Sequence, residues 1–112
     1  MTSGNSARAE LHREALDALG DATRREILEM LSRGGRSVQE IADDLPISRP
    51  AVSRHLRLLK DAGLAIDEHE GTRRVYHLRQ EGIDAIREYF ERVWDEAAVR
   101  FRMVAENTQR QD

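Results

Sequence analysis

The sequence lacks cysteine, has only two prolines and five aromatic residues among 112, and contains no apolar run longer than three residues. The absence of cysteine excludes disulfides and thiolate metal ligands. The absence of a long apolar run argues against a membrane-spanning segment and against the hydrophobic core of a signal peptide. We therefore expect one small cytoplasmic domain, without a membrane partner, whose modest core is assembled from short amphipathic elements.

Charged residues make up 35% of the chain and are distributed unevenly along it. Residues 1–44 carry 6 basic and 9 acidic side chains, and residues 80–112 carry 5 and 8, so each flank has a net charge of −3. Residues 45–79 carry 7 basic and 4 acidic side chains, a net charge of +3. Because the local potential governs attraction to phosphate, this middle segment is a candidate nucleic-acid surface despite the acidic total.

Two short amphipathic segments, joined by a break, lie in and just before the basic region. The first has Ser37 and Glu40 at the spacing of a capping box, followed by a short apolar stripe. Pro46 ends this segment because proline disfavours helical geometry in the residue before it. The second segment ends at Gly63, which suits a left-handed helix stop. Together they predict a helix-turn-helix unit over residues 37–63.

The second of these helices has an apolar side and a basic side. The apolar side consists of Ala51, Val52, Leu56, Leu58, Leu59 and Ala62. A short helix whose other side carries arginine, serine and lysine suits the major groove, where arginine can bond guanine bidentately and serine can reach phosphates. The predicted DNA contacts from this helix are Ser48, Arg49, Pro50, Ser53, Arg54, His55, Arg57 and Lys60. The alternative is an ordinary amphipathic helix with a solvated basic face.

A β-hairpin is predicted over residues 64–78, around the three-residue loop Glu70-Gly71-Thr72. The register that matches apolar faces pairs Leu64 with Leu78, Ile66 with Tyr76, and Glu68 with Arg74. Arg73 and Arg74 lie beside the tip, where such a wing could touch an adjacent phosphate or the minor groove. A hairpin after a helix-turn-helix predicts a winged helix.

A long amphipathic helix is predicted from residue 82 to about residue 107, which would extend about 40 Å. Its apolar residues fall within an arc of about 100°. They are Ile83, Ile86, Phe90, Val93, Trp94, Ala97, Phe101 and Val104. A stripe of this length exceeds what one small domain can cover, so we expect a homodimer through the first and last helices. The predicted interface residues are Leu11, Leu16, Ile86, Phe90, Val93, Trp94, Ala97 and Phe101. The alternative is that the stripe packs within one subunit.

Three segments in this order resemble the ArsR/SmtB family of winged-helix repressors. Residues 18–28, which read ALGDATRREIL, resemble the opening signature of that family. Residues 48–64, with the core Ala-Val-Ser-Arg-His-Leu, resemble its recognition helix, and residues 71–78, ending Tyr-His-Leu, resemble its wing. The resemblance covers roughly residues 11–106. It implies a homodimeric bacterial transcriptional repressor that binds double-stranded DNA at an inverted-repeat operator.

The metal-sensing members of that family use cysteines in the helix before the recognition helix, or Asp/His pairs on the final helix. This chain departs from both patterns, since its last histidine is His77. In the matched register His69 and His77 are four residue steps apart, roughly 13 Å, which is too far for a shared ion. We therefore predict no metal and no cofactor, and leave open a small-molecule effector of unknown identity.

The predicted fold is mostly α with a small β-hairpin: a winged helix-turn-helix of about five helices and a two-stranded wing. One domain is expected over residues 8–107, with the wing at 64–78, the dimerisation helix at 82–107, and disordered tails at 1–7 and 108–112. No nucleophile–base motif or phosphate loop points to an enzyme. The alternative function is a winged-helix protein-interaction module without DNA binding. The basic face argues against it, because protein interfaces favour apolar and aromatic side chains.

Overall fold

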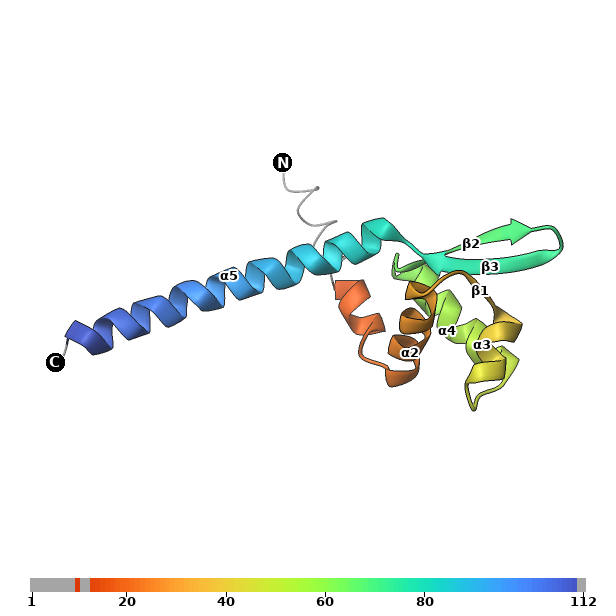
Figure 1. The fold of residues 1–112 in the computed structure, drawn as a ribbon, viewed down its shortest axis with the longest axis horizontal. Helices are drawn as coiled ribbons and strands as arrows, with labels where there is room; N and C mark the ends of the chain where they lie inside the picture. The colour runs from red at the N-terminus through yellow and green to blue at the C-terminus, as the bar shows by residue number, and fades with distance from the viewer. Residues whose placement is uncertain (1–9, 11–12, 111–112) are drawn as a thin grey trace.

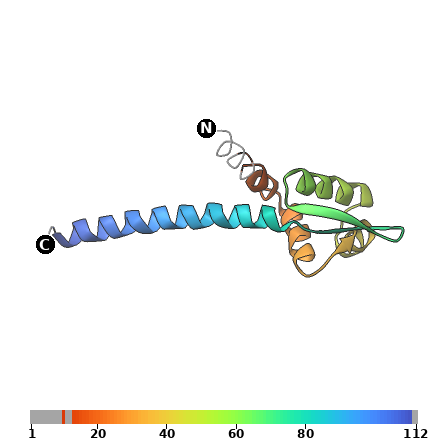
Figure 2. The same cartoon turned by 90° about the horizontal axis from the view of Figure 1, so that it is seen from above.

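The computed structural model describes residue 10 and residues 13–110. Leu11 and the tail predicted at residues 1–7 therefore lie outside the described residues. In chain order the elements are α2 (Ala22–Ser32), β1 (Arg36–Ser37), α3 (Val38–Asp44), α4 (Arg49–Asp61), β2 (Ala65–Glu70), β3 (Arg73–Leu78) and α5 (Gln80–Arg110). Residues 13–18 are helical as well. Figures 1 and 2 show a head built from α2, α3, α4 and the hairpin, from which α5 projects as a rod.

The two helices of the helix-turn-helix begin at serine caps. At α3, the Ser37 hydroxyl oxygen accepts a hydrogen bond from the Glu40 backbone N–H, and the Glu40 carboxylate accepts one from the Ser37 N–H, both at 3.2 Å. At α4, the Ser48 hydroxyl oxygen accepts a bond of 3.3 Å from the Ala51 N–H. After α4, Gly63 adopts a φ of 79°, which favours glycine. The helix-turn-helix prediction is confirmed.

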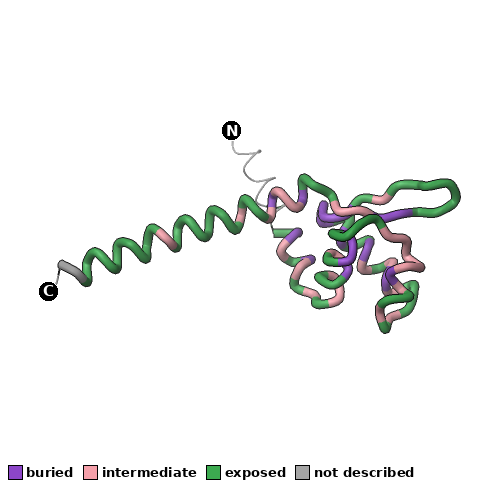
Figure 3. The backbone as a smooth tube through the Cα atoms, viewed as in Figure 1, coloured by how far each residue is buried: buried purple, intermediate pink, exposed green. Residues whose placement is uncertain are grey.

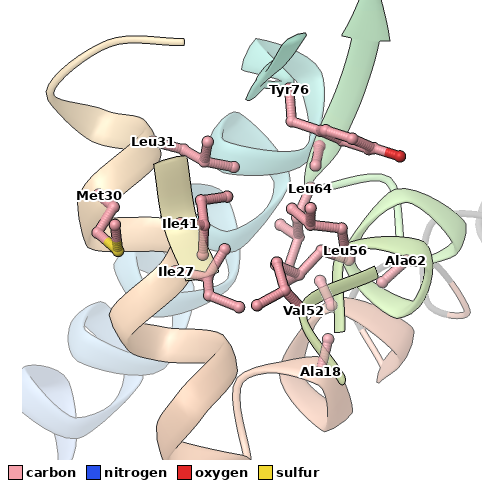
Figure 4. Close-up of a cluster of buried hydrophobic side chains, with 13 residues drawn as sticks. Ala18, Ile27, Met30, Leu31, Ile41, Val52, Leu56, Ala62, Leu64 and Tyr76 are labelled. Carbon is pink, nitrogen blue, oxygen red and sulfur yellow. The ribbon is translucent and has the colours of Figure 1, made fainter. Parts of the chain in front are cut away.

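The core of the head collects apolar side chains from the helix at residues 13–18, from α2, α3 and α4, and from the hairpin (Figure 4). Its largest fully buried members are Ile27, Ile41, Val52, Leu56, Leu59 and Leu64. Leu58 was expected on the apolar side of α4, but it is 41% exposed. Side chains two residues apart on a helix point in directions about 200° apart. Because Leu56 points into the core, Leu58 points away from it.

The hairpin differs from its prediction in strand number, loop and register. The sheet has three strands in the order β1-β3-β2, because the two residues of β1 pair with β3. Glu70 pairs with Arg73, so only Gly71 and Thr72 form the turn. Gly71 has a φ of 65°, which matches the first central position of a type II′ turn.

The register of β2 against β3 is shifted by one residue from the predicted one. Ala65 pairs with Leu78 and Asp67 pairs with Tyr76. Because strand side chains alternate between faces, Asp67 shares the inner face with the buried Ala65 and Tyr76. Ile66 lies on the other face and is 41% exposed. The predicted register assumed that the apolar Ile66 faces inward. It is wrong because the carboxylate of Asp67 takes the inner face instead.

The same shift corrects the predicted distance between the two wing histidines. His69 pairs with Arg74 and His77 pairs with Ile66, so they are three residue steps apart and on opposite faces. The His77 imidazole packs against Gly35, where a Cβ would lie 2.3 Å from its Cε1 atom. The two imidazoles therefore face different surroundings.

Helix α5 is longer than predicted, and most of its apolar stripe is uncovered. It spans 31 residues and includes residues 108–110, which were assigned to a tail. No glycine or proline interrupts it after Gly82, and the Thr108 hydroxyl donates to the Val104 carbonyl at 2.9 Å. At its start, Ile83 and Ile86 pack against the core. Farther along, Phe90 is 54% exposed, and Trp94 and Phe101 are each 74% exposed. Most of the projecting part of α5 is coloured as exposed in Figure 3.

No described element of the same subunit covers the stripe beyond Ile86. The alternative that the whole stripe packs within one subunit is therefore excluded for the described residues. Among the described helices, none has both the length and the apolar composition that a membrane crossing requires.

Candidate nucleic-acid interface

The structure brings the start of α4 and the wing arginines around one groove. The groove has a volume of about 580 Å³. It is lined by Ser37, Val38, Gln39, Glu40, Arg49, Arg73 and Arg74. Arg49 comes from the first turn of α4, whereas Arg73 and Arg74 come from β3. Side chains from the two predicted DNA-contacting elements therefore lie together.

Three of the four cations on the basic side of α4 have no ion-pair partner among the described residues. Arg49, Arg54 and Arg57 are exposed, and they form no ion pair within the part of the chain that the structure describes. Ser53 is half-buried among them, and Pro50 is exposed in the first turn. The guanidinium groups are thus free to meet an anion or a base edge, and each still has its full set of donors.

The His55 side chain extends from α4 toward the start of α2, and Arg54 lines the same hollow. Its side chain is 20% exposed, and its Nδ1 is 3.9 Å from Oδ1 of Asp21. That Nδ1 atom is buried and has no hydrogen-bond partner. Asp21 caps α2 by accepting a bond of 3.0 Å from the Arg24 N–H. This bond, together with the charges of Arg24 and His55, lowers the pKa of Asp21.

Lys60 and Arg74, both predicted to contact DNA, share one carboxylate. The Lys60 Nζ lies 2.6 Å from Oδ1 of Asp67, and the Arg74 Nε lies 3.1 Å from its Oδ2. The Asp67 side chain is only 12% exposed. The Lys60 hydrogen bond, with the charges of Lys60 and Arg74, lowers the pKa of Asp67. Asp67 therefore stays ionised and links the last turn of α4 to both strands of the wing.

Arg73 is paired in a more open setting. Its Nη2 bonds to Oε1 of Glu40, and the two side chains are 57% and 45% exposed. The Ser37 backbone N–H and hydroxyl lower the pKa of Glu40, and Arg73 and Arg36 add to this effect. The sequence pattern identified Glu40 only as a helix cap and did not identify Asp67. The one available signal was a carboxylate that interrupts the apolar alternation of β2.

The predicted dimer residues separate into two groups. Leu16 and Ile86 are half-buried, and Ile86 packs against the core of its own chain. Phe90, Val93, Trp94, Ala97 and Phe101 are exposed along one side of α5. A hollow of about 490 Å³ lies over Trp94, Ala97, Ala98, Phe101 and Arg102. Among the described residues, no group of three or more histidine, aspartate or glutamate side chains is placed to hold a metal ion.

Known proteins resemble this chain in both sequence and fold. The family model described as "Bacterial regulatory protein, arsR family" matches residues 21–67. The chain is 52% identical, over 83 residues, to the HTH-type transcriptional regulator Rv2034 of Mycobacterium tuberculosis, covering 74% of this chain and 78% of that protein. It is 41% identical, over 54 residues, to the transcriptional repressor SdpR of Bacillus subtilis, covering 48% of this chain and 60% of the repressor.

Its fold matches the solution structure of the homodimeric winged helix-turn-helix DNA-binding domain of Mb0332 from Mycobacterium bovis. The TM-score is 0.66 at 27% identity, and the match covers 86% of each chain. The predicted winged helix-turn-helix architecture and the predicted family are both confirmed. The matched relatives and the fold together assign this chain to the ArsR family of transcriptional regulators.

Proposed function

We propose that this regulator binds a specific DNA operator as a homodimer and represses transcription there. In this proposal α4 enters the major groove, and the β2–β3 hairpin lies on the flanking backbone. The observation that carries it is the set of exposed, unpaired guanidinium groups of Arg49, Arg54 and Arg57 on one side of α4. Exposed arginines on one side of a short helix create a positive local potential that attracts phosphate, and their guanidinium groups can bond base edges bidentately.

The roles of these residues follow from their positions. Arg54 and Arg57 lie one turn apart in the middle of α4, where a helix in the major groove meets base edges. Arg49 in the first turn and Arg73 at the wing line the same groove, so we assign them to the phosphate backbone. The half-buried His55 is assigned a supporting position behind α4, beside Asp21. No catalytic step is part of this proposal.

The homodimer is supported by the uncovered stripe on α5 and by the charge distribution along that helix. Residues 80–96 carry 2 basic and 6 acidic side chains, a net charge of −4. Residues 97–110 carry 3 basic and 1 acidic side chain, a net charge of +2. An antiparallel second copy therefore places acidic against basic halves, while a two-fold axis relates identical apolar patches. The two α4 helices then face two half-sites of an inverted repeat.

Repression is the simplest consequence of bivalent binding, because a dimer bound across a promoter blocks access to the same DNA. The relative SdpR is a repressor, which supports the same direction of control. Such a protein acts where the chromosome lies, so we place it in the cytoplasm. An interaction module without DNA binding would leave the unpaired arginines of α4 unexplained.

The test is to select DNA fragments from the source genome with the purified protein, and to measure affinity for the selected site. Arg54→Ala should weaken binding by about 1–3 kcal/mol if Arg54 reads a guanine edge. The double variant Arg54→Ala/Arg57→Ala should lose more. Arg33→Ala/Arg79→Ala is the matched control, because it removes two exposed arginines outside α4, the wing and the apolar stripe of α5. Selection of no fragment, or equal losses in both double variants, would contradict the proposal.

A further inference from the structure

The carboxylate of Asp67 occupies an unusual place for an acidic residue in a DNA-binding head. It lies on the inner face of the hairpin with the buried Tyr76, and it contacts Lys60 from α4 and Arg74 from β3. Among the described residues, this is the ion cluster that joins the recognition helix to the wing. A carboxylate amid the protein's own DNA-binding cations would ordinarily weaken DNA binding by repelling phosphate.

Burial decides whether Asp67 can act as a simple competitor of phosphate. A phosphate that drew Lys60 and Arg74 away would leave a largely buried carboxylate without partners, which is strongly unfavourable. We therefore expect its two bonds, at 2.6 and 3.1 Å in the free chain, to persist when DNA binds. The Glu40–Arg73 pair differs, because both side chains are about half exposed and water can solvate Glu40 after release.

We propose that Asp67 is a positioning residue for DNA recognition. It holds the wing at a set distance from α4, so that the wing meets the backbone when Arg54 and Arg57 meet the bases. Glu40, by contrast, occupies Arg73 in the free protein as a displaceable substitute for a DNA phosphate. This inference rests on the proposed function.

Two substitutions that each remove one negative charge distinguish positioning from repulsion. Asp67→Asn and Glu40→Gln are nearly isosteric, and glutamine preserves the capping box at Ser37. Affinity is measured for the selected operator and for an unrelated duplex of equal length, at several salt concentrations. Glu40→Gln should raise both affinities by about two- to fivefold and leave their ratio unchanged.

Asp67→Asn should instead lower the ratio of operator to unrelated affinity by roughly threefold or more, because the wing no longer shares one geometry with α4. Affinity for the unrelated duplex should be unchanged or raised. Asp67→Glu, which keeps the charge, should retain part of the ratio. If Asp67→Asn raises both affinities equally, as Glu40→Gln does, or if Asp67→Glu loses as much as Asp67→Asn, the positioning role is overturned.

A second measurement needs no DNA and separates this inference from the proposed function. Backbone amides of β2 and β3 should exchange hydrogen faster in free Asp67→Asn than in wild type or Glu40→Gln, while the amides of α2 remain unchanged. Wild-type exchange rates in the wing would overturn the inference even if the operator is bound. An Asp67→Asn chain that unfolds altogether would overturn it too, because Asp67 would then support the whole head. A wild-type chain that selects no DNA, yet shows the wing effect, would refute only the DNA-binding proposal.

Discussion

Replacing Phe101 with glutamate tests the assembly more directly than any other single change. Phe101 is 74% exposed in the single chain and lies on the apolar stripe of α5. The substitution therefore removes little packing from the folded subunit and should leave the head intact. Its effect should fall on the contact between two copies, where the stripe is expected to be buried.

The magnitude follows from the area that the partner covers. Burying one phenylalanine side chain stabilises an interface by about 1.5–3 kcal/mol, and a two-fold interface contains two copies, so the loss is about 3–6 kcal/mol. The dimer dissociation constant should therefore rise by roughly two to four orders of magnitude. A glutamate left without a partner in an apolar seam adds to this loss. Operator affinity should fall as well, since binding to two half-sites is bivalent.

Sedimentation over a range of concentrations gives the dissociation constant, and a gel shift gives operator affinity. Val99→Glu is the matched control, because Val99 is 47% exposed on the same helix but lies about 200° around it from Phe101. It should leave both quantities unchanged. A Phe101→Glu protein that dimerises like wild type would refute the argument, and so would an equal loss in Val99→Glu.

Three further predictions concern stability, acid sensitivity and metals. Gly82→Ala should lower the free energy of unfolding by about 1–3 kcal/mol in denaturant titrations, although alanine favours helix. The cause is that a Cβ at Gly82 would lie 1.9 Å from the Gly63 carbonyl oxygen, so unchanged stability would contradict this packing. Asp21→Ala should lower the melting temperature at neutral pH, since Asp21 caps α2. The pKa of Asp21 in the folded chain lies below its usual value of 3.8. The stability that the ionised Asp21 side chain contributes is therefore complete above pH 3.8 and is lost as the pH falls through the folded-state pKa. A deficit that persists in strong acid would contradict this origin. Zinc, cadmium, nickel or arsenite at micromolar concentration should change operator affinity by less than about tenfold relative to a chelator control. A larger loss of operator affinity, without aggregation, would show that a metal ion does control DNA binding.

The sequence alone determined the helix-turn-helix, the long last helix and, apart from Leu58, which side of α4 is apolar. A capping box joins residues three apart, so Ser37 with Glu40 is readable from local spacing. Gly63 marks the end of α4 because glycine favours the left-handed stop after a helix. The apolar stripe of α5 is readable for the same reason, because a helix repeats about every 3.6 residues whatever surrounds it. The length of the predicted helix also indicated that its stripe would extend beyond the head.

Only the tertiary structure decided how the wing is registered and which charges on the head are already paired. Strand pairing joins residues whose faces depend on what packs against each side, and a one-residue shift reverses every face. Asp67 could take the inner face because Lys60 reaches it from α4 and Arg74 from the adjacent strand. Glu40 meets Arg73 across 33 residues of chain. No local pattern encodes such contacts, since they exist only after the helices and the hairpin have packed together.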